Sequence, residues 1–263
     1  MPELPEVETM MRALGNLSGR IFVSFDFFWP RQIEPSPDIF REKLTNAQIK
    51  EVKRRGKYIC LLTDKGLLAI HLRMSGALTT LPEEAPIGKH TRIVAHLSGG
   101  QKLQFDDARK FGRWKFVSLN EDIPGVGMEP FSALFTPEWL YNALKKPKNK
   151  PIKTVLLDQS LLCGLGNIYS DEVLFAAKIH PERPSSSVTL VECKALKEAI
   201  ITILNQAIDL KGTSFDWAYG GGSMQNNLMV YGRLGKPCHH CQTILESVRI
   251  GGRRSVFCPK CQK

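Results

Sequence analysis

The chain opens with a proline and closely spaced carboxylates, a combination that could perform chemistry on an aldehydic carbon. Its first residues are Met1-Pro2-Glu3-Leu4-Pro5-Glu6. Because Pro2 is small, we expect Met1 to be removed, which would leave the Pro2 amine at the N-terminus. The pKa of an α-amino group is about 7.7–8.0, against about 10.4 for lysine, so a larger fraction of the α-amine is unprotonated and able to attack at neutral pH. Such an amine can form an iminium while a nearby carboxylate moves protons. The alternative is that these acids only cap a helix.

Four cysteines near the other end of the chain have the spacing of a metal site. Cys238 and Cys241 form one C-x2-C pair, and Cys258 and Cys261 form a second pair sixteen residues later. Two such pairs supply the four thiolates of a tetrahedral zinc site. We therefore expect one structural zinc ion, in a ribbon whose two short strands lie between the pairs. A redox role for the pairs is the alternative.

The elements that position the N-terminal group come from the first half of the chain. After Pro5, apolar residues at Val7, Met10, Met11 and Leu14 have the spacing of one helical face. Short apolar segments then alternate with turns, which is typical of an antiparallel sandwich or barrel. We expect strands over residues 21–29, 57–62, 66–72, 91–97, 101–105 and 113–119, and a helix over 39–49.

Helical periodicity dominates the second half, after a linker between about residues 120 and 150. We expect helices over residues 136–146, 151–160, 168–179 and 189–210. Asn167 can cap the third of these. Between the cysteine pairs, residues 243–250 and 255–257 alternate as strands, with Gly251 and Gly252 in the turn.

Charge and composition limit the possible partners. The chain has 263 residues, with 36 Lys plus Arg against 26 Asp plus Glu, a formal net charge of +10. The segment 223–263 alone holds 7 basic and 1 acidic side chains. Such an excess indicates a polyanion, with nucleic acid first and an anionic membrane second. No uncharged apolar run is long enough to span a membrane, and three early glutamates do not fit a signal peptide, so we expect a cytoplasmic protein.

Several motifs occur together in one order. They are MPELPEVET, RRGKY, HLRMSG, DDARKFGRW, GLGNIYSDE, MQNNLMVYGR and the two C-x2-C pairs. In combination, from Pro2 to Cys261, they closely resemble the bacterial formamidopyrimidine-DNA glycosylase family, the 8-oxoguanine DNA glycosylase/AP lyases. The resemblance implies an α+β fold: a two-sheet antiparallel β sandwich with flanking helices, then a helix–two-turn–helix domain that ends in a zinc ribbon. We place these parts at residues 1–130, 131–223 and 224–263.

The resemblance also implies a reaction and the residues that perform it. A damaged base is flipped out of double-stranded DNA, because its target atom is unreachable in the stack. The Pro2 amine attacks the sugar C1′, the base leaves, and β,δ-elimination cuts the strand. In this correspondence Glu3 protonates the sugar oxygen, Glu6 helps to hold the site and Lys57 contacts phosphate. Arg253, with Arg254 as the neighbouring candidate, grips phosphates from the tip of the ribbon.

A second set of residues corresponds to the family's DNA contacts. Met74 and Phe111 would fill the space left by the flipped nucleotide, and Arg109 would face the orphaned pyrimidine. The positions that correspond to backbone contacts, or that suit them by charge, are His71, His90, Lys148, Lys153 and Asn167. We expect a monomer that acts on damaged duplex DNA, is associated with the nucleoid when bound, and has no membrane partner.

Two departures from the family pattern concern specificity. Ala108 stands where the family often has proline, and the glycine-rich segment 212–224 is shorter than in typical members. Since the family loop closes over 8-oxoguanine, formamidopyrimidines or other oxidised bases could be preferred here. Alternatives are a glycosylase of the endonuclease VIII type acting on oxidised pyrimidines, a damaged-DNA binder without catalysis, and a zinc-ribbon module of transcription or translation.

Overall fold

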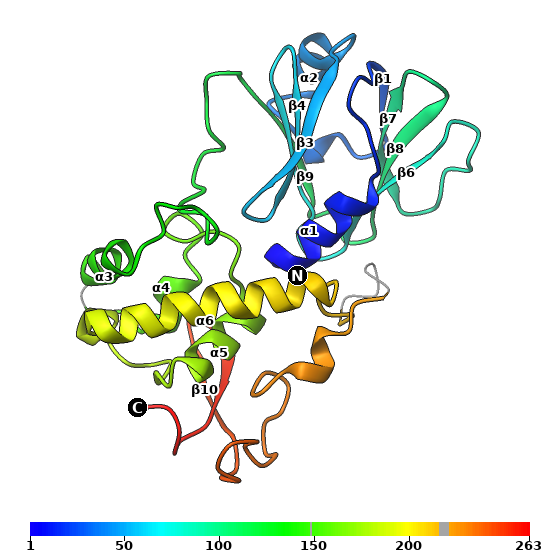
Figure 1. The fold of residues 1–263 in the computed structure, drawn as a ribbon. Coiled ribbons are helices and arrows are strands. Elements are labelled where there is room, and N and C mark those ends of the chain that lie inside the picture. Colours follow the sequence, from blue (N-terminus) through cyan, green and yellow to red (C-terminus); the bar gives the residue numbers. More distant parts are fainter. Residues whose placement is uncertain (148, 216–220) are drawn as a thin grey trace. The chain divides into compact units, whose positions relative to one another are not determined.

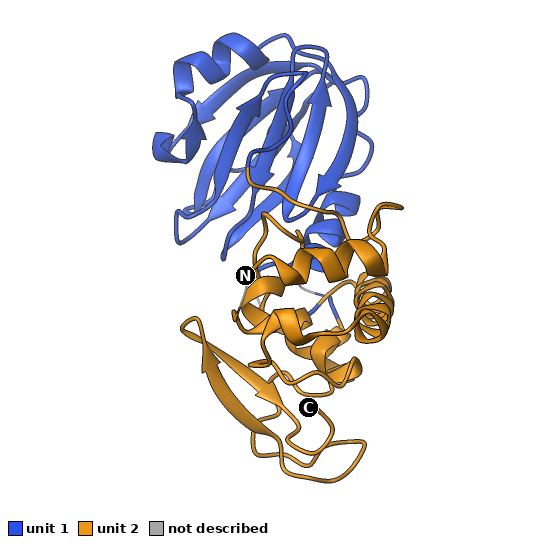
Figure 2. Cartoon of the chain, turned by 90° about the vertical axis from the view of Figure 1, so that its left-hand side faces the viewer, with its two compact units in different colours: residues 1–124, 213–222 blue, residues 125–212, 223–263 orange. Residues whose placement is uncertain are grey.

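The computed structural model describes residues 1–147, 149–215 and 221–263 of the chain. These residues form two compact units, coloured separately in Figure 2. Unit 1 contains residues 1–124 and 213–222, and unit 2 contains residues 125–212 and 223–263. Lys148 and residues 216–220 lie outside the described residues.

Unit 1 is built on two β-sheets that share no strand. The four-stranded sheet has the order β1–β7–β8–β6, and the five-stranded sheet has the order β2–β9–β5–β4–β3. Every pairing is antiparallel except that of β2 with β9. The bounds are β1 Phe22–Phe27, β2 Ile33–Glu34, β3 Ile49–Arg55, β4 Tyr58–Thr63, β5 Leu67–His71, β6 Gly76–Pro82, β7 Thr91–Leu97, β8 Gln101–Asp107 and β9 Arg113–Val117.

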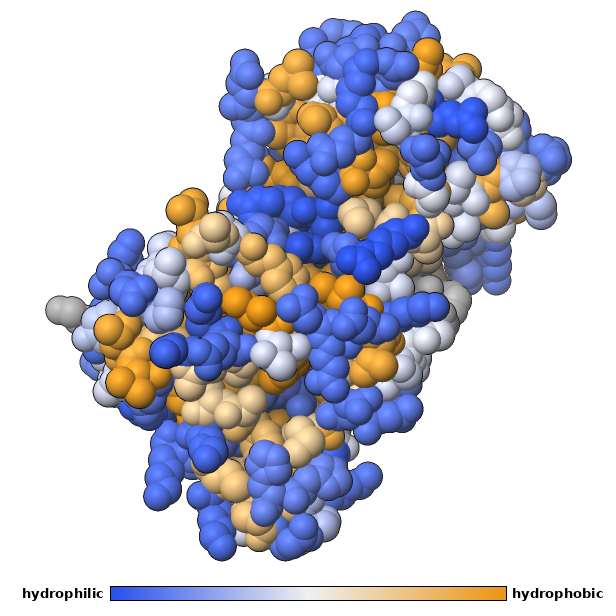
Figure 3. Space-filling model, in the orientation of Figure 1, coloured by the Kyte–Doolittle hydropathy of each residue, from blue (hydrophilic) through white to orange (hydrophobic). Residues whose placement is uncertain are grey.

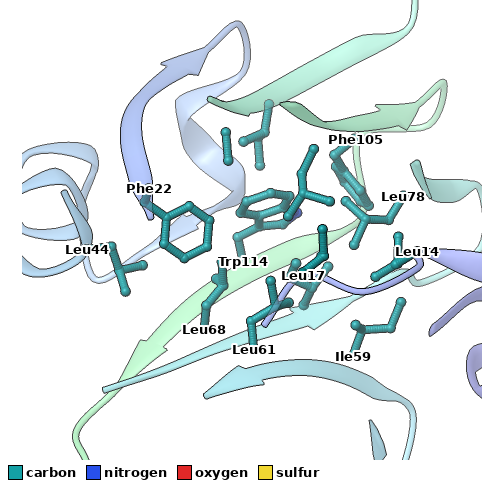
Figure 4. Close-up of a cluster of buried hydrophobic side chains, with 14 of the residues drawn as sticks. Leu14, Leu17, Phe22, Leu44, Ile59, Leu61, Leu68, Leu78, Phe105 and Trp114 are labelled. Carbon is teal, nitrogen blue, oxygen red and sulfur yellow. The ribbon is translucent and has the colours of Figure 1, made fainter. Parts of the chain in front are cut away.

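The core of unit 1 lies between the two sheets. Phe105 of β8 and Trp114 of β9 come from different sheets, and their ring centroids are 5.8 Å apart. Figure 4 shows apolar side chains of both sheets meeting around Trp114. Two helices, α1 Leu4–Ala13 and α2 Pro37–Leu44, bury one face each, as their apolar spacing requires. The expected sandwich is confirmed.

Unit 2 contains the remaining helices and a C-terminal hairpin (Figure 1). The helices are α3 Pro137–Lys145, α4 Ile152–Leu156, α5 Asn167–Ala176 and α6 Leu190–Asp209, and the hairpin is β10 Glu246–Ile250 with β11 Arg253–Phe257. Short 3₁₀ turns are η1 Pro30–Gln32 in unit 1, and η2 Ser185–Ser187 and η4 Met224–Asn227 in unit 2. Thr189 caps α6 with a reciprocal capping box, because its hydroxyl and Glu192 satisfy each other's backbone N–H groups.

The structure corrects some expected elements. The cap of α5 is Gly166, so Asn167 is the first helical residue and not the cap. The expected helix over 39–49 is α2, which begins and ends earlier, because residues 46–48 turn into β3. Strands β3 and β6 were not expected.

No helix among the described residues is long and apolar enough to cross a membrane. Figure 3 shows hydrophilic side chains spread over the visible face of each unit.

Candidate active site and nucleic-acid interface

The first turn of α1 gathers the N-terminal candidates in a buried position. Pro2 is buried, and Glu3 and Glu6 are each only 2% exposed. Glu3 and Glu6 form a reciprocal capping box, in which the Glu3 N–H donates to Glu6 Oε2 at 2.9 Å. Proline in the first turn and carboxylates at the N-terminal end of the helix dipole favour this start. The helix start therefore holds two carboxyl groups beside Pro2.

Glu6 also fixes a segment that is distant in sequence. Its Oε1 accepts hydrogen bonds from the Thr213 N–H at 2.8 Å and from the Thr213 hydroxyl at 3.2 Å. Both oxygens of this carboxylate are thus engaged, one with the backbone of Glu3 and one with Thr213. Glu6 ties Thr213, the second residue of the glycine-rich segment 212–224, to the turn that carries Pro2.

Arg54 connects α1 to the turn that carries Lys57. Its Nε lies 3.0 Å from Glu8 Oε2, and its Nη1 donates to the Gly56 carbonyl at 3.1 Å. Lys57, in the turn between β3 and β4, is 4% exposed. The structure thus brings α1 and the Lys57 turn together through one guanidinium group.

His71 ends β5 as a neutral histidine. Burial first, and then the nearby charges of Arg73 and Lys57, lower the pKa of His71 to about 3. Its Nδ1 accepts the Arg73 N–H at 3.0 Å, so the ring proton must be on Nε2. The Tyr58 ring packs edge-on against it, with centroids 4.7 Å apart. His71 can therefore offer an Nε2–H donor without a charge.

Two neighbouring loops present the side chains expected to fill a gap in DNA. Met74, in the turn between β5 and β6, is 41% exposed, and Phe111, in the loop between β8 and β9, is 46% exposed. Arg109 stacks on Phe111, with its guanidinium carbon 4.9 Å from the ring centroid. His90 is exposed and joins the same region, since its carbonyl accepts the Asp107 N–H at 2.8 Å. The two loops therefore present two exposed apolar side chains together with one guanidinium group.

In unit 2, Lys153 is placed differently from an exposed backbone contact. Its side chain is fully buried, and its Nζ lies 2.7 Å from Asp171 Oδ1. The same Nζ donates to the Arg254 carbonyl at 3.3 Å, and Asn167 Nδ2 donates to that carbonyl at 3.1 Å. Lys153 and Asn167 thus both hold the strand that begins at the hairpin tip. Lys153 faces protein in this structure, because its charge is satisfied there.

Arg253 is exposed at the tip of the C-terminal hairpin. It is the first residue of β11 and pairs with Ile250 across the Gly251–Gly252 turn. Both glycines have positive φ, which the tight turn requires. Arg254 is also exposed. The other expected backbone contact, Lys148, lies outside the described residues.

The sequence interpretation missed two buried acids of α5. Asp171 Oδ1 accepts the Ser255 hydroxyl at 2.5 Å, and its Oδ2 accepts the Val256 N–H at 3.1 Å. Glu172 accepts the N–H groups of three consecutive residues, 229–231, at 2.8–3.0 Å. Burial raises the pKa of both carboxyls, although these donors oppose the shift. The sequence signal for these two acids is their position inside the otherwise apolar run IYSDEVLF. Acids that are buried with such a run need hydrogen-bond donors.

The four C-terminal cysteines converge as a metal site. Their sulfur atoms all lie within 4.8 Å of one another. The Sγ atoms of Cys241 and Cys258 are 3.5 Å apart, and those of Cys238 and Cys261 are 4.0 Å apart. Zinc–sulfur bonds of about 2.3 Å in a tetrahedron require sulfur separations of about 3.8 Å. The cluster therefore fits one zinc ion with four protein ligands.

Three domain families match the chain in order along its length. The formamidopyrimidine-DNA glycosylase N-terminal domain matches residues 1–114, and the H2TH domain of the same enzymes matches residues 126–218. The zinc finger found in FPG and IleRS matches residues 235–263. The chain belongs to the formamidopyrimidine-DNA glycosylase family. Members of the family are DNA-repair glycosylases with AP lyase activity, and the four-cysteine cluster is its structural zinc site.

Full-length relatives support the family assignment. The formamidopyrimidine-DNA glycosylase of Desulforamulus reducens is 43% identical over 100% of this chain and 99% of its own, and that of Bacillus cereus strain ATCC 14579 is 41% identical over the same shares. A Lactococcus lactis Fpg (MutM) complex with N7-benzyl-Fapy-dG DNA is 37% identical, with a TM-score of 0.90 and complete coverage of both chains. A MutM complex with carbocyclic 8-oxo-G DNA is 36% identical, with a TM-score of 0.91 and the same coverage.

Proposed function

We propose that this chain excises oxidised purines from duplex DNA with the Pro2 amine as nucleophile and then cuts the strand. The observation that carries the proposal is the buried group of Pro2, Glu3 and Glu6 at the start of α1. In a family whose structures include complexes with Fapy-dG and 8-oxo-G DNA, this group is what a glycosylase/lyase needs. The activity requires removal of Met1, because an amide nitrogen cannot attack.

The proposed reaction begins with attack of the Pro2 amine on the sugar. The Pro2 nitrogen forms a bond to C1′ of the damaged nucleotide as the glycosidic bond breaks and its electron pair leaves on the base. The proton lost from the Pro2 nitrogen neutralises the departing base. Glu3 protonates the sugar ring oxygen as the ring opens, which leaves an iminium between Pro2 and C1′. Loss of a C2′ proton then drives β-elimination of the 3′ phosphate, and loss of the C4′ proton drives δ-elimination of the 5′ phosphate. Water finally hydrolyses the iminium, which releases the sugar remnant and restores the Pro2 amine. The Glu6 carboxylate positions Glu3 through the backbone hydrogen bond.

The proposed DNA contacts lie on both units. In unit 1, Met74 and Phe111 fill the space of the extruded nucleotide and Arg109 faces the orphaned base. Lys57, His71 and His90 contact phosphates there. In unit 2, Asn167, Lys148 and Arg253, or its neighbour Arg254, supply backbone contacts. We also propose that the domain boundaries lie at residues 130 and 223. The protein would act as a monomer in the cytoplasm and would associate with the nucleoid when it is bound to DNA.

Borohydride trapping tests the nucleophile. If an iminium links Pro2 to the sugar, reduction must yield a covalent protein–DNA adduct that maps to the N-terminal peptide. A variant with an uncleaved N-terminal extension should form no adduct, yet should bind DNA with unchanged salt dependence, because binding rests on distant cations. Lys57→Ala should slow turnover without moving the adduct. A full-strength adduct on the extended protein would refute the proposal.

Incision of four matched duplexes tests the substrate class. The lesions are 8-oxoguanine, a formamidopyrimidine, thymine glycol and an abasic site. We expect the two purine lesions to be cut faster than thymine glycol, with the formamidopyrimidine first because of the short segment 212–224. Preference for thymine glycol would instead indicate the endonuclease VIII type, and binding without incision would indicate a non-catalytic binder.

A further inference from the structure

Three segments of unit 1 meet at one buried carboxylate, Asp107, which ends β8 and is fully buried. Its Oδ1 accepts the Ser75 hydroxyl at 2.5 Å. Its Oδ2 accepts Gln32 Nε2 at 2.7 Å and the Gly112 N–H at 2.8 Å. Ser75 follows Met74 directly, and Gly112 follows Phe111 directly. One carboxylate therefore joins the Met74 turn, the Phe111 loop and the segment before β2.

The Phe111 loop is attached at both ends. The Gly112 N–H binds Asp107 itself, and the Arg109 N–H donates to Ser75 Oγ at 3.1 Å, so the other end is held through the hydroxyl that Asp107 orients. In between, Lys110 has a positive φ of 61°, and its ammonium lies 3.8 Å from the Trp29 ring centroid. The backbone on either side of Phe111 is thus fixed while its ring stays exposed.

The junction suits a carboxylate. Three donors converge on Asp107, and a carboxylate accepts on both oxygens. An asparagine whose carbonyl accepts Gln32 and Gly112 turns its NH₂ group toward Ser75, so the Ser75 hydroxyl has to rotate and no longer donates to residue 107. The space is equally restricted. A Cβ at position 112 would meet Phe105 Cζ at 2.4 Å and Asp107 Oδ2 at 3.2 Å, so only glycine permits this approach.

We propose that Asp107 is a positioning residue for lesion extrusion, because it holds the Met74 turn and the Arg109–Phe111 loop at one fixed spacing so that they insert as one unit. The inference rests on the proposed gap-filling role of those side chains. Without the junction, each loop would have to be ordered at the moment of insertion, which opposes extrusion of a stacked base. Cleavage of a pre-formed abasic site, where no base has to be held out, is affected less.

The test compares Asp107→Asn and Ser75→Ala with a matched control, Asp106→Asn. Asp106 is the preceding residue of β8, and its carboxylate binds Thr91 and Gln104 rather than either loop. Single-turnover excision from a formamidopyrimidine duplex, cleavage of an abasic duplex, and fluorescence of 2-aminopurine placed opposite the lesion are measured well below each variant's melting temperature. We expect a loss of about tenfold in excision, because charge-assisted hydrogen bonds hold both loops in place.

In both junction variants we expect the excision rate to fall at least about threefold more than the rate of abasic cleavage, and the rise in 2-aminopurine fluorescence to be smaller than in the wild type. The effects of the two substitutions should be non-additive when combined, since they remove one shared interaction. Asp106→Asn should match the wild type. Met74→Ala and Phe111→Ala are measured in parallel. If these separate the two activities while Asp107→Asn and Ser75→Ala do not, the positioning role is refuted and the gap-filling role stands. If none of the four separates them, both fall. Should Asp107→Asn not fold, Ser75→Ala alone decides.

Discussion

The ammonium of Lys153 lies 2.7 Å from Asp171 Oδ1, and both side chains are completely buried. The pair joins α4 to α5, and through Ser255 and the backbone of residues 254 and 256 it joins both to β11. The strand that presents Arg253 is therefore held from behind by a buried charge pair. A buried pair of this kind is costly to break on one side only.

Lys153→Met should therefore destabilise unit 2 by about 3–5 kcal/mol, because it leaves Asp171 buried without its cation. The double variant Lys153→Met/Asp171→Leu should recover much of this loss. Urea unfolding measures the effect, with Lys150→Met, an exposed lysine of the same stretch, as control. A direct phosphate contact by Lys153 predicts the opposite pattern. The stability of Lys153→Met would then be unchanged, and the slope of log K for DNA binding against log salt concentration would fall by the equivalent of about one phosphate contact.

His71 predicts a defined loss of stability in acid. The folded chain keeps His71 neutral down to a pKa of about 3, whereas an unfolded histidine protonates near about 6.5. As the pH falls between these values, the unfolded chain binds the proton first, so stability falls with it. His71→Asn removes this term. We expect the loss of stability from pH 7 to pH 4.5 to be smaller in the variant by about 2–3 kcal/mol.

Urea denaturation at the two pH values checks the histidine term. His90→Asn is the control, since His90 is exposed. Equal acid sensitivity of the wild type and His71→Asn would contradict the prediction. Excess acid sensitivity in the variant would show that His71 is charged in the folded chain.

Apolar alternation predicted the strands that are buried on one or both faces, such as β5 and β7. It missed β3, whose sequence IKEVKRR is mostly charged because the strand lies at a sheet edge. It also missed β6, the edge strand of the other sheet, which begins with glycine and ends with proline. Strand order depends on pairings between distant residues, such as Phe22 with Leu97, which no local pattern specifies.

The candidate site was predictable where a motif is local and less so where burial decides. The capped turn at Glu3 and Glu6 and the paired cysteines are short-range patterns. Lys153 is different, because a lysine in a basic stretch indicates a solvated surface, whereas its position between Ile152 and Val155 places it in the core. The Asp107 junction joins residues 32, 75 and 112, and its logic becomes visible only when the three segments are folded together.

The zinc site predicts one tightly held metal ion per chain. Four thiolates leave no position for water, so the ion is structural. Cys258→Ser should loosen the hairpin, because Cys258 directly follows β11, and should weaken DNA binding by displacing Arg253. Elemental analysis and binding isotherms at fixed salt measure the two effects. Cys193→Ser, a buried cysteine of α6, is the control and should keep its zinc. An iron–sulfur cluster, or protein free of metal, would contradict the assignment.

Glu6 predicts a coupling between the N-terminal turn and residue 213. Its carboxylate accepts the Glu3 N–H on one oxygen and two groups of Thr213 on the other. A glutamine has the same shape, but it must present an NH₂ group to one of these donors. Glu6→Gln should therefore lower stability by about 1–3 kcal/mol and slow borohydride trapping at Pro2, because the turn that carries the amine is no longer fixed. Thr213→Val keeps the backbone hydrogen bond and loses only the hydroxyl, so its effect should be smaller than that of Glu6→Gln.

Glu42→Gln, at an exposed acid of α2, controls for loss of charge alone. Thermal melts and single-turnover trapping rates measure both effects, and a Thr213→Val variant as impaired as Glu6→Gln would show that the hydroxyl, and not the capped turn, is what Glu6 serves.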